Sequence, residues 1–101
     1  MNVDVFKAFS DANRLKILEI LADEELCACK IQENLNITQP TLSHHMSTLQ
    51  KGGLVNVRKS GQWSHYSINV EALNEVIAYV SSLIPKADRA DATSGCESDA
   101  Y

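Results

Sequence analysis

Two short amphipathic segments joined by a turn of only a few residues constrain the fold of this chain most. The first segment covers residues 26–35, and the second begins after Thr38, a residue suited to cap a helix N-terminus. Pro40 falls in the first turn of the second segment, where a missing backbone N–H does no harm. Gly52 and Gly53 end this segment. The pattern predicts two helices arranged as a helix-turn-helix.

An alternating segment follows directly and predicts a β-hairpin. Residues 54–58 and 63–68 alternate apolar and polar side chains, and residues 59–62 between them form a small basic tip. A helix-turn-helix followed by such a hairpin is a winged helix-turn-helix. The expected fold class is therefore mainly α with a small β-hairpin.

Helical periodicity also marks both ends of the chain. Residues 2–9 predict a short first helix, and Ser10 or Asp11 caps a second helix with a wide apolar stripe. The last helix starts near Val70 and ends at Pro85, and its apolar residues recur in steps of three and four. Such a seam is typical of helices that pair with one another. Its members are Val70, Leu73, Ile77, Val80 and Ile84.

The expected organisation is one domain with a tail. The 101 residues, 45% of them hydrophobic, suffice for one modest core. Residues 1–85 are predicted to form the folded domain, and residues 86–101, rich in Ala, Asp, Ser and Gly, a mobile tail. No apolar run approaches the ~20 residues that cross a bilayer, and the N-terminus lacks the features of a signal peptide. A cytoplasmic protein without membrane association is expected.

Charge is unevenly distributed along the chain. The formal net charge of −4 by itself argues against nucleic acid, yet no acidic residue lies within residues 38–69. Lys51, Arg58 and Lys59 give this stretch a charge of +3, and all three histidines lie in it, while the rest of the chain carries −7. Phosphate binding requires local rather than global positive charge, so this distribution is compatible with double-stranded DNA as a partner.

The second helix of the motif divides into two faces at about 100° per residue. Leu42, Met46 and Leu49 mark the buried face, and His45 at its edge is interpreted as a packed, hydrogen-bonded histidine. His65 is interpreted as a cross-strand partner, and the aromatic rings of the hairpin as packing groups. Hydroxyl, imidazole and amide groups can contact phosphates and base edges. The candidate DNA-contacting residues on the outer face and hairpin are Thr41, Ser43, His44, Ser47, Lys51, Lys59 and Gln62.

Three cysteines, two of them one residue apart, form a poor disulfide framework and a better ligand or redox set. Cys27 and Cys29 fall at the start of the predicted third helix, where positions i and i+2 point about 200° apart. Both thiolates can then hold one ion only in a frayed first turn, so that ion binding deforms the helix. Thiolates select soft ions, and two are too few for a closed zinc site. A structural or incidental role for the pair is the alternative.

Several segments together resemble the arsenic-repressor metal-sensor family (ArsR/SmtB). Residues 25–31 (ELCACKI) resemble the family's metal-binding box, and the likeness covers about residues 5–84. Further segments match in the family's order, namely residues 9–18, 38–45, 53–55 and 58–66. The resemblance implies a winged-helix homodimer, paired through its first and last helices, that represses a resistance operon and releases operator DNA when an ion binds.

The resemblance also assigns roles to particular residues. Cys27 and Cys29 match the box whose thiolates bind As(III) or Sb(III), and in other members Cd(II) or Pb(II). Gln39, Ser43 and His44 fall on positions that face DNA in the family. The expected protein is a repressor and not an enzyme, and it needs no organic cofactor.

Departures from the family's pattern affect the ion site. Many arsenite-sensing relatives have a third cysteine where this chain has Gln32, and no cysteine precedes Cys27 as in cadmium and lead sensors. The last helix has Glu71 and Glu75 but no histidine, so the family's zinc site there is expected to be absent. Cys96 either supplies a third ligand, from its own or the partner chain, or is an inert tail cysteine. A two-cysteine box favours As(III) or Sb(III), which accept few thiolate ligands.

Two alternatives stand beside this hypothesis. A redox-responsive repressor of the same fold would oxidise Cys27 or Cys29, with Cys96 or the other subunit as the disulfide partner, because cysteines one residue apart make a strained disulfide. A thiol enzyme or metal-scavenging protein is less consistent with the sequence. No Cys-His-acid set stands out, and the histidines lie on or beside the predicted DNA face.

Overall fold

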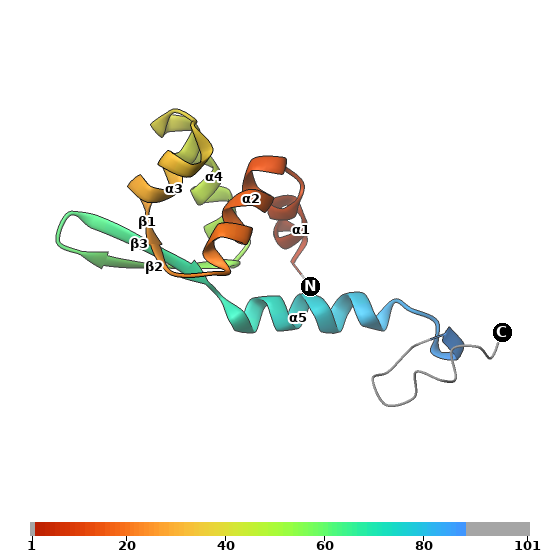
Figure 1. Ribbon diagram of the computed structural model, residues 1–101. Coiled ribbons are helices and arrows are strands. Elements are labelled where there is room, and N and C mark those ends of the chain that lie inside the picture. Colours follow the sequence, from red (N-terminus) through yellow and green to blue (C-terminus); the bar gives the residue numbers. More distant parts are fainter. Residues whose placement is uncertain (1, 89–101) are drawn as a thin grey trace.

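The computed structural model describes residues 2–88, and Cys96 and most of the predicted tail lie outside them. The elements in chain order are α1 (Val3–Phe9), α2 (Ala12–Leu21), β1 (Leu26–Cys27), α3 (Ala28–Leu35), α4 (Gln39–Lys51), β2 (Val55–Ser60), β3 (Trp63–Ile68), α5 (Val70–Ser82) and the 3₁₀ helix η1 (Lys86–Asp88). Helices α1 to α4 pack together, and the tip of the β2–β3 hairpin points away from α5 (Figure 1). Within residues 2–88 no helix has the length and apolar character needed to cross a membrane.

Side-chain caps begin the helices close to the predicted positions. The Asp11 carboxylate accepts the N–H groups of Asn13 and Arg14 at 2.8 and 3.1 Å at the start of α2. The Thr38 hydroxyl accepts the N–H of Thr41 at the start of α4. Each such cap stabilises a helix by about 1 kcal/mol, because it satisfies a backbone donor that the helix itself cannot.

The sheet contains a third strand that the sequence pattern misses. β1 pairs with β3, and β3 pairs with β2, all antiparallel, in the order β1-β3-β2. The prediction that the third helix begins at Leu26 is therefore wrong, because Leu26 and Cys27 are extended and pair with Tyr66 and His65 of β3. Helix α3 begins at Ala28, and Cys27 occupies the cap position with φ −79° and ψ 160°.

The hairpin is longer and its turn tighter than predicted. Ser60 of β2 pairs with Trp63 of β3, which leaves only Gly61 and Gln62 as the turn. Gly61 has φ +64°, a conformation that favours glycine and is typical of two-residue hairpin turns. Lys59, expected in the tip, therefore lies within a strand. We call this β2–β3 hairpin the wing.

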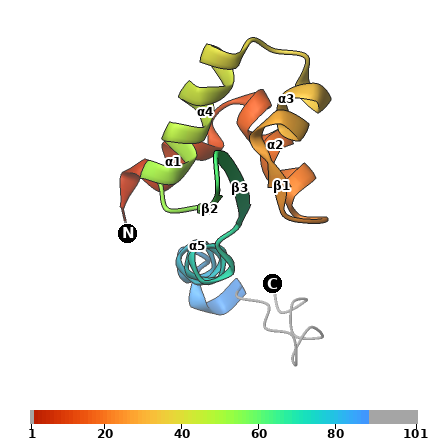
Figure 2. The same ribbon diagram turned by 90° about the vertical axis from the view of Figure 1, so that its left-hand side faces the viewer.

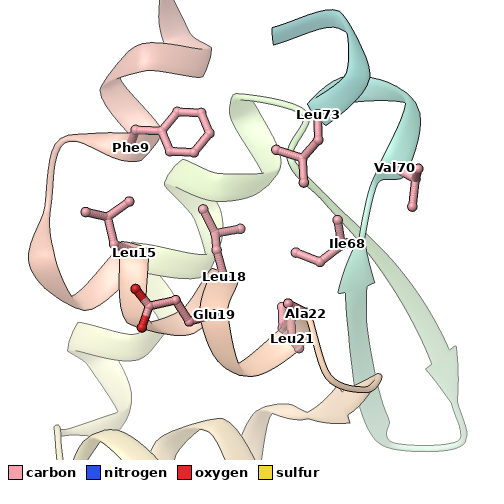
Figure 3. A pocket seen from close by; sticks show the side chains of 9 residues that line it. All are labelled: Phe9, Leu15, Leu18, Glu19, Leu21, Ala22, Ile68, Val70 and Leu73. Carbon is pink, nitrogen blue, oxygen red and sulfur yellow. The ribbon is translucent and has the colours of Figure 1, made fainter. Parts of the chain in front are cut away.

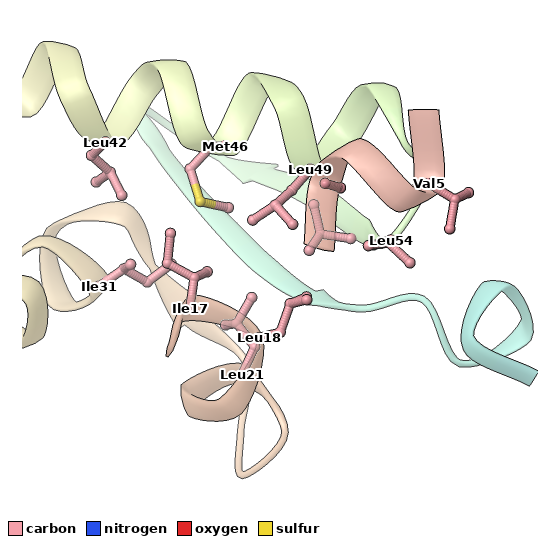
Figure 4. Close-up of a cluster of buried hydrophobic side chains, with 11 residues drawn as sticks. Val5, Ile17, Leu18, Leu21, Ile31, Leu42, Met46, Leu49 and Leu54 are labelled. Carbon is pink, nitrogen blue, oxygen red and sulfur yellow. The ribbon is translucent and has the colours of Figure 1, made fainter. Parts of the chain in front are cut away.

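A single apolar cluster holds α2, α3 and α4 together (Figure 4). Leu42, Met46 and Leu49 project from α4 toward α2 and α3, which confirms the predicted buried face. Ile17 of α2 and Ile31 of α3 are fully buried on the opposite side. The position and tilt of α4 are thus set by its contacts with α1, α2 and α3.

Helix α5 leaves much of its apolar surface exposed. Viewed along its axis, α5 lies below α1 to α4 (Figure 2). Leu73 packs against the core, whereas the side chains of Val70 and Ile77 are 64% and 61% exposed. The helix ends at Ser82, so Ile84, the last member of the predicted seam, lies beyond it. Most of the seam thus remains uncovered within one chain.

An apolar pocket of about 610 Å³ opens between α2 and the start of α5 (Figure 3). Phe9 and Leu15 project into it from the first two helices, and Val70 borders it from α5. On another side of α5, the rings of Phe6 and Tyr79 meet with their centroids 5.7 Å apart. Helix α5 thus contacts α1 through Phe6 and Tyr79, and it borders an apolar pocket together with α2.

Candidate nucleic-acid interface and thiol site

The predicted DNA-contacting side chains are all exposed on α4 and the wing. Helix α4 carries most of them, β2 carries Lys59, and the wing turn carries Gln62. Gln39 and Ser43 at the N-terminal part of α4 line one pocket with Gln62, whereas Lys51 lies at the opposite end of the helix. The exposed members are Gln39, Thr41, Ser43, His44, Ser47, Lys51, Lys59 and Gln62.

A hydrogen-bonded arginine anchors α4 to the first two helices. Arg14 donates from Nη1 to Nδ1 of His45 at 3.1 Å, from Nε to the Ala8 carbonyl at 3.1 Å, and from Nη2 to the Lys7 carbonyl at 3.0 Å. Because arginine only donates, Nδ1 of His45 must be unprotonated, and its Nε2 lies 3.8 Å from Asp11 Oδ2. This confirms His45 as a packed, hydrogen-bonded residue.

Burial lowers the pKa of His45 below its usual value of 6.5. The neighbouring Arg14 and His44 act in the same direction, and Asp11 opposes them. His45 is only 7% exposed, and its hydrogen bond to Arg14 fixes the orientation of the ring. Through Arg14, His45 links α4 to α2 and to the C-terminus of α1.

The turn of the helix-turn-helix is fixed from α3. Asn36 adopts a left-handed conformation with φ 55°, which ends α3, and its N–H donates to the Gln32 carbonyl at 2.9 Å. The side-chain amide of Gln32 donates to the Ile37 carbonyl at 3.1 Å. Gln32 therefore stabilises the turn of the helix-turn-helix.

An ion pair removes one positive charge from the predicted DNA surface. Arg58 of β2 binds Glu25 through two hydrogen bonds of 2.9 and 3.2 Å, and this bond raises the pKa of Arg58 and lowers that of Glu25. Glu25 precedes β1, outside the acid-free stretch, so counting charge along the chain could not detect it. Lys51 and Lys59 remain exposed.

The two neighbouring cysteines lie at the junction of β1 and α3. Cys27 lies on the strand and is half-buried, and Cys29 lies in the first turn of α3 and is exposed. A hydrogen bond from the Cys29 thiol lowers the pKa of Cys27, with the backbone N–H of Lys30 acting in the same direction. The same contact raises the pKa of Cys29.

This arrangement corrects the expected mechanics of the thiol pair. Cys27 and Cys29 are not two positions of one regular helix, because Cys27 is extended and precedes α3. Their convergence therefore needs no deformation of the helix. No third His, Cys, Asp or Glu joins them into a metal-binding group within residues 2–88, and Cys96 lies outside this range.

Two side-chain pairs of this region could not be predicted from the sequence. Arg14 and His45 are separated by 31 residues, and Arg58 and Glu25 by 33. No local sequence signal identifies partners that lie so far apart in the chain. The predicted cross-strand role of His65 is confirmed, and its partners on the two sides are Cys27 and Arg58.

A helix-turn-helix with an exposed second helix, flanked by a β-hairpin wing, defines a DNA-binding regulator of the winged helix-turn-helix class. The model of the family described as "Bacterial regulatory protein, arsR family" matches residues 11–57. The chain belongs to this family and is a transcriptional repressor within it.

Individual relatives agree with this assignment. HTH-type transcriptional regulator MJ1325 of Methanocaldococcus jannaschii, itself uncharacterised, is 44% identical over 81 residues, which are 79% of this chain and 91% of that protein. An arsenical resistance operon repressor of Staphylococcus aureus is 44% identical over 73 residues, 72% of this chain and 70% of that protein. The homodimeric winged helix-turn-helix DNA-binding domain Mb0332 of Mycobacterium bovis superposes with a TM-score of 0.67 at 31% identity, covering 80% of this chain and 75% of that one.

Proposed function

We propose that this repressor is a homodimer that releases operator DNA when As(III) or Sb(III) binds Cys27 and Cys29. The observation that carries the proposal is the position of these two thiols, two residues apart, at the junction of the wing sheet and the first helix of the helix-turn-helix. An ion held there acts on both parts of the DNA-binding unit at once.

DNA binding by α4 and the wing is supported by what these elements expose. Helix α4 presents amide, hydroxyl and imidazole groups, and Lys51 and Lys59 supply positive charge. Such groups on a recognition helix contact phosphates and base edges in the major groove. Gln62 at the wing turn would contact the adjacent backbone or minor groove.

A homodimer formed through α1 and α5 is supported by the apolar surface of these helices. Val70, Ile77 and Leu83 are all more than half exposed, and the apolar pocket beside α2 continues this surface. Contiguous exposed apolar area of this kind is typical of association surfaces. A two-fold dimer would present two α4 helices to successive major grooves about 34–36 Å apart.

The chemistry of the site favours a thiol-seeking ion of low coordination number. Two sulfur ligands suit soft ions, and the lowered pKa of Cys27 favours the thiolate that binds them. A structural zinc site needs four ligands, and such a set is lacking within residues 2–88. Cys96 is retained as a candidate third ligand, from the same or the partner chain.

The coupling route follows from the register of the sheet. Cys27 pairs with His65 of β3, the central strand of the sheet. An ion bound to the Cys27 sulfur would therefore restrain the wing. Cys29 lies one turn before Gln32, which holds the helix-turn-helix turn, so fixing its sulfur restrains α4. A coupling free energy of about 1–3 kcal/mol between the two sites would weaken DNA binding roughly 5- to 150-fold.

The test is fluorescence anisotropy of the reduced, full-length protein on labelled DNA taken from just upstream of its own gene. Arsenite, cadmium and zinc are titrated separately. The proposal predicts release by near-stoichiometric arsenite and little response to zinc. Tight DNA binding that none of the ions disturbs would be consistent with a repressor but would contradict its response to As(III) or Sb(III). Release by cadmium alone would identify Cd(II) as the inducer instead.

A redox-responsive repressor is the second candidate, favoured by the lowered pKa of Cys27 beside the exposed Cys29 thiol. A thiolate is the species that peroxides and polysulfides attack. Because the two cysteines are separated by one residue, the disulfide partner would be Cys96 or the other subunit. Oxidant-dependent crosslinking seen by mass spectrometry, together with an absent arsenite response, would favour this candidate over the ion sensor.

A further inference from the structure

A second pocket lies beside Cys29, between the wing and the helix-turn-helix. Its volume is about 450 Å³, which falls within the ~300–1,000 Å³ range of small-molecule sites. Cys29 and Gln32 border it from α3, and Trp63 and Tyr66 border it from β3. A group attached to an atom bound by the Cys29 sulfur would therefore have room in this pocket.

One part of the pocket suits an aromatic ring. Trp63, the single tryptophan of the chain, is 53% exposed although it lies against this pocket. Met46 from α4 and Tyr66 from the wing also line it. Aromatic rings pair favourably with other rings in offset or edge-to-face contacts, and the methionine sulfur adapts to them.

The number of sulfur ligands points to a particular class of arsenic compound. Trivalent arsenic forms three bonds, and within residues 2–88 only Cys27 and Cys29 are available as a thiol pair. An arsenic(III) that already carries one organic group needs just two more bonds. Two thiols therefore complete its coordination without Cys96.

We propose, resting on the proposed function above, that Cys27 and Cys29 bind monosubstituted organoarsenic(III) compounds and that the pocket beside Trp63 selects those with an aryl group. In the binding step R–As(OH)₂ reacts with two cysteine thiols. Two As–S bonds form, two As–O bonds break, the thiol protons leave with the hydroxyls as two waters, and arsenic stays trivalent.

Occupation of the pocket also bears directly on DNA binding. Gln39, Ser43 and Gln62, all candidate DNA contacts, border the same pocket. An aryl group there would contact side chains that the operator requires, so ligand and DNA compete for them. An aryl arsenical should therefore release DNA at lower concentration than an arsenical with the same two bonds to sulfur and a smaller substituent.

The experiment compares phenylarsonous acid, methylarsonous acid and arsenite as releasing agents in the DNA anisotropy assay with the reduced, full-length protein. Methylarsonous acid forms the same two As–S bonds without a ring. The phenyl compound should act at roughly tenfold lower concentration than the methyl compound, the low end expected for partial burial of an aromatic ring. Stoichiometric phenyl addition should also change the fluorescence of Trp63.

Trp63→Ala and Val57→Ala separate the pocket from the rest of the wing. Val57 is an exposed apolar residue of β2 that does not border the pocket. The phenyl-to-methyl ratio should fall to about one in Trp63→Ala and persist in Val57→Ala. Because the two compounds are compared within each variant, any effect of the substitution on DNA affinity itself cancels in the ratio of their releasing concentrations.

The outcomes distinguish this inference from the proposed function. Equal potency of the phenyl and methyl compounds, or a preference that persists in Trp63→Ala, would overturn the aryl pocket even if arsenite releases DNA. Failure of all three arsenicals to release DNA would overturn the proposed function and the inference together.

Discussion

Cys27 lies directly opposite His65, on neighbouring antiparallel strands, and His65 lies opposite Arg58 on its other side. The thiol site is therefore part of the sheet from which the wing extends. Arg58 in turn binds Glu25, the residue immediately before β1. A change at Cys27 thus has two short routes to the wing, one through the strand pairing and one through this ion pair.

Breaking the Glu25–Arg58 pair should strengthen nonspecific DNA binding. In Glu25→Gln, Arg58 is released and can neutralise one more phosphate, so the slope of log K against log salt should become steeper by about 1. Stability should change little, because both side chains are exposed. The measurement is DNA affinity across a salt series.

Glu24→Gln provides the matched control for this prediction. It removes the same negative charge from the neighbouring exposed position, so it tests the effect of net charge alone. An equal slope in the two variants would mean that Arg58 does not contact phosphate when its carboxylate partner is lost.

Stability should fall on the acid side because of His45. Its lowered pKa means that the unfolded chain takes up a proton more readily than the folded one. The free energy of unfolding should thus be at its full value above pH 6.5, fall as the pH drops below 6.5, and stop falling once His45 is protonated in the folded protein too. Urea unfolding between pH 8 and pH 5 measures this.

His45→Gln should reduce this pH dependence, since its amide oxygen can still accept from Arg14 but does not titrate. His44→Gln removes only the smallest of the effects that lower the pKa of His45, so this variant should retain most of the dependence. If both variants retain the wild-type pH profile, another group is responsible.

Adding a third thiol should strengthen the ion site. Gln32 lies one turn after Cys29, and the two residues border the same pockets. Gln32→Cys should lower the arsenite concentration needed for release by roughly tenfold, equivalent to ~1.4 kcal/mol. Gln32→Ala serves as the control, because both variants lose the hydrogen bond to Ile37, worth about 0.5–1.5 kcal/mol. Release of DNA by the same arsenite concentration in Gln32→Cys and Gln32→Ala would show that position 32 cannot supply a ligand.

A charge on the exposed seam of α5 should dissociate the dimer. Ile77→Arg places a cation where the account expects an apolar contact, and burying it unpaired is strongly unfavourable. Light scattering at micromolar concentration should then detect a monomer, whereas Ile77→Leu should remain dimeric. An Ile77→Arg dimer as tight as the wild type would locate the interface elsewhere.

The helices could be predicted from the sequence because their signals are local. Asp11 and Thr38 cap their helices within three residues, and the buried face of α4 repeats with the helical period. The edge position of His45 was enough to predict a packed histidine. Its partner Arg14 was not predictable, because the contact depends on how α1, α2 and α4 pack.

Strand β1 shows where local reasoning fails. Two residues have no periodicity, and Leu26 and Cys27 are extended only because β3 offers them an edge to pair with. The same long-range pairing decides that Cys27 precedes α3 and can meet Cys29. The sequence places the two cysteines one residue apart, but it does not show that they lie on either side of the start of α3.

The most direct test of the central claim is the arsenite titration of operator-bound protein in which both Cys27 and Cys29 are replaced by alanine. Neither side chain belongs to the predicted DNA face, so the double variant should bind DNA as the wild type does and stay bound as arsenite is added. Release of the double variant at the wild-type arsenite concentration would contradict the account.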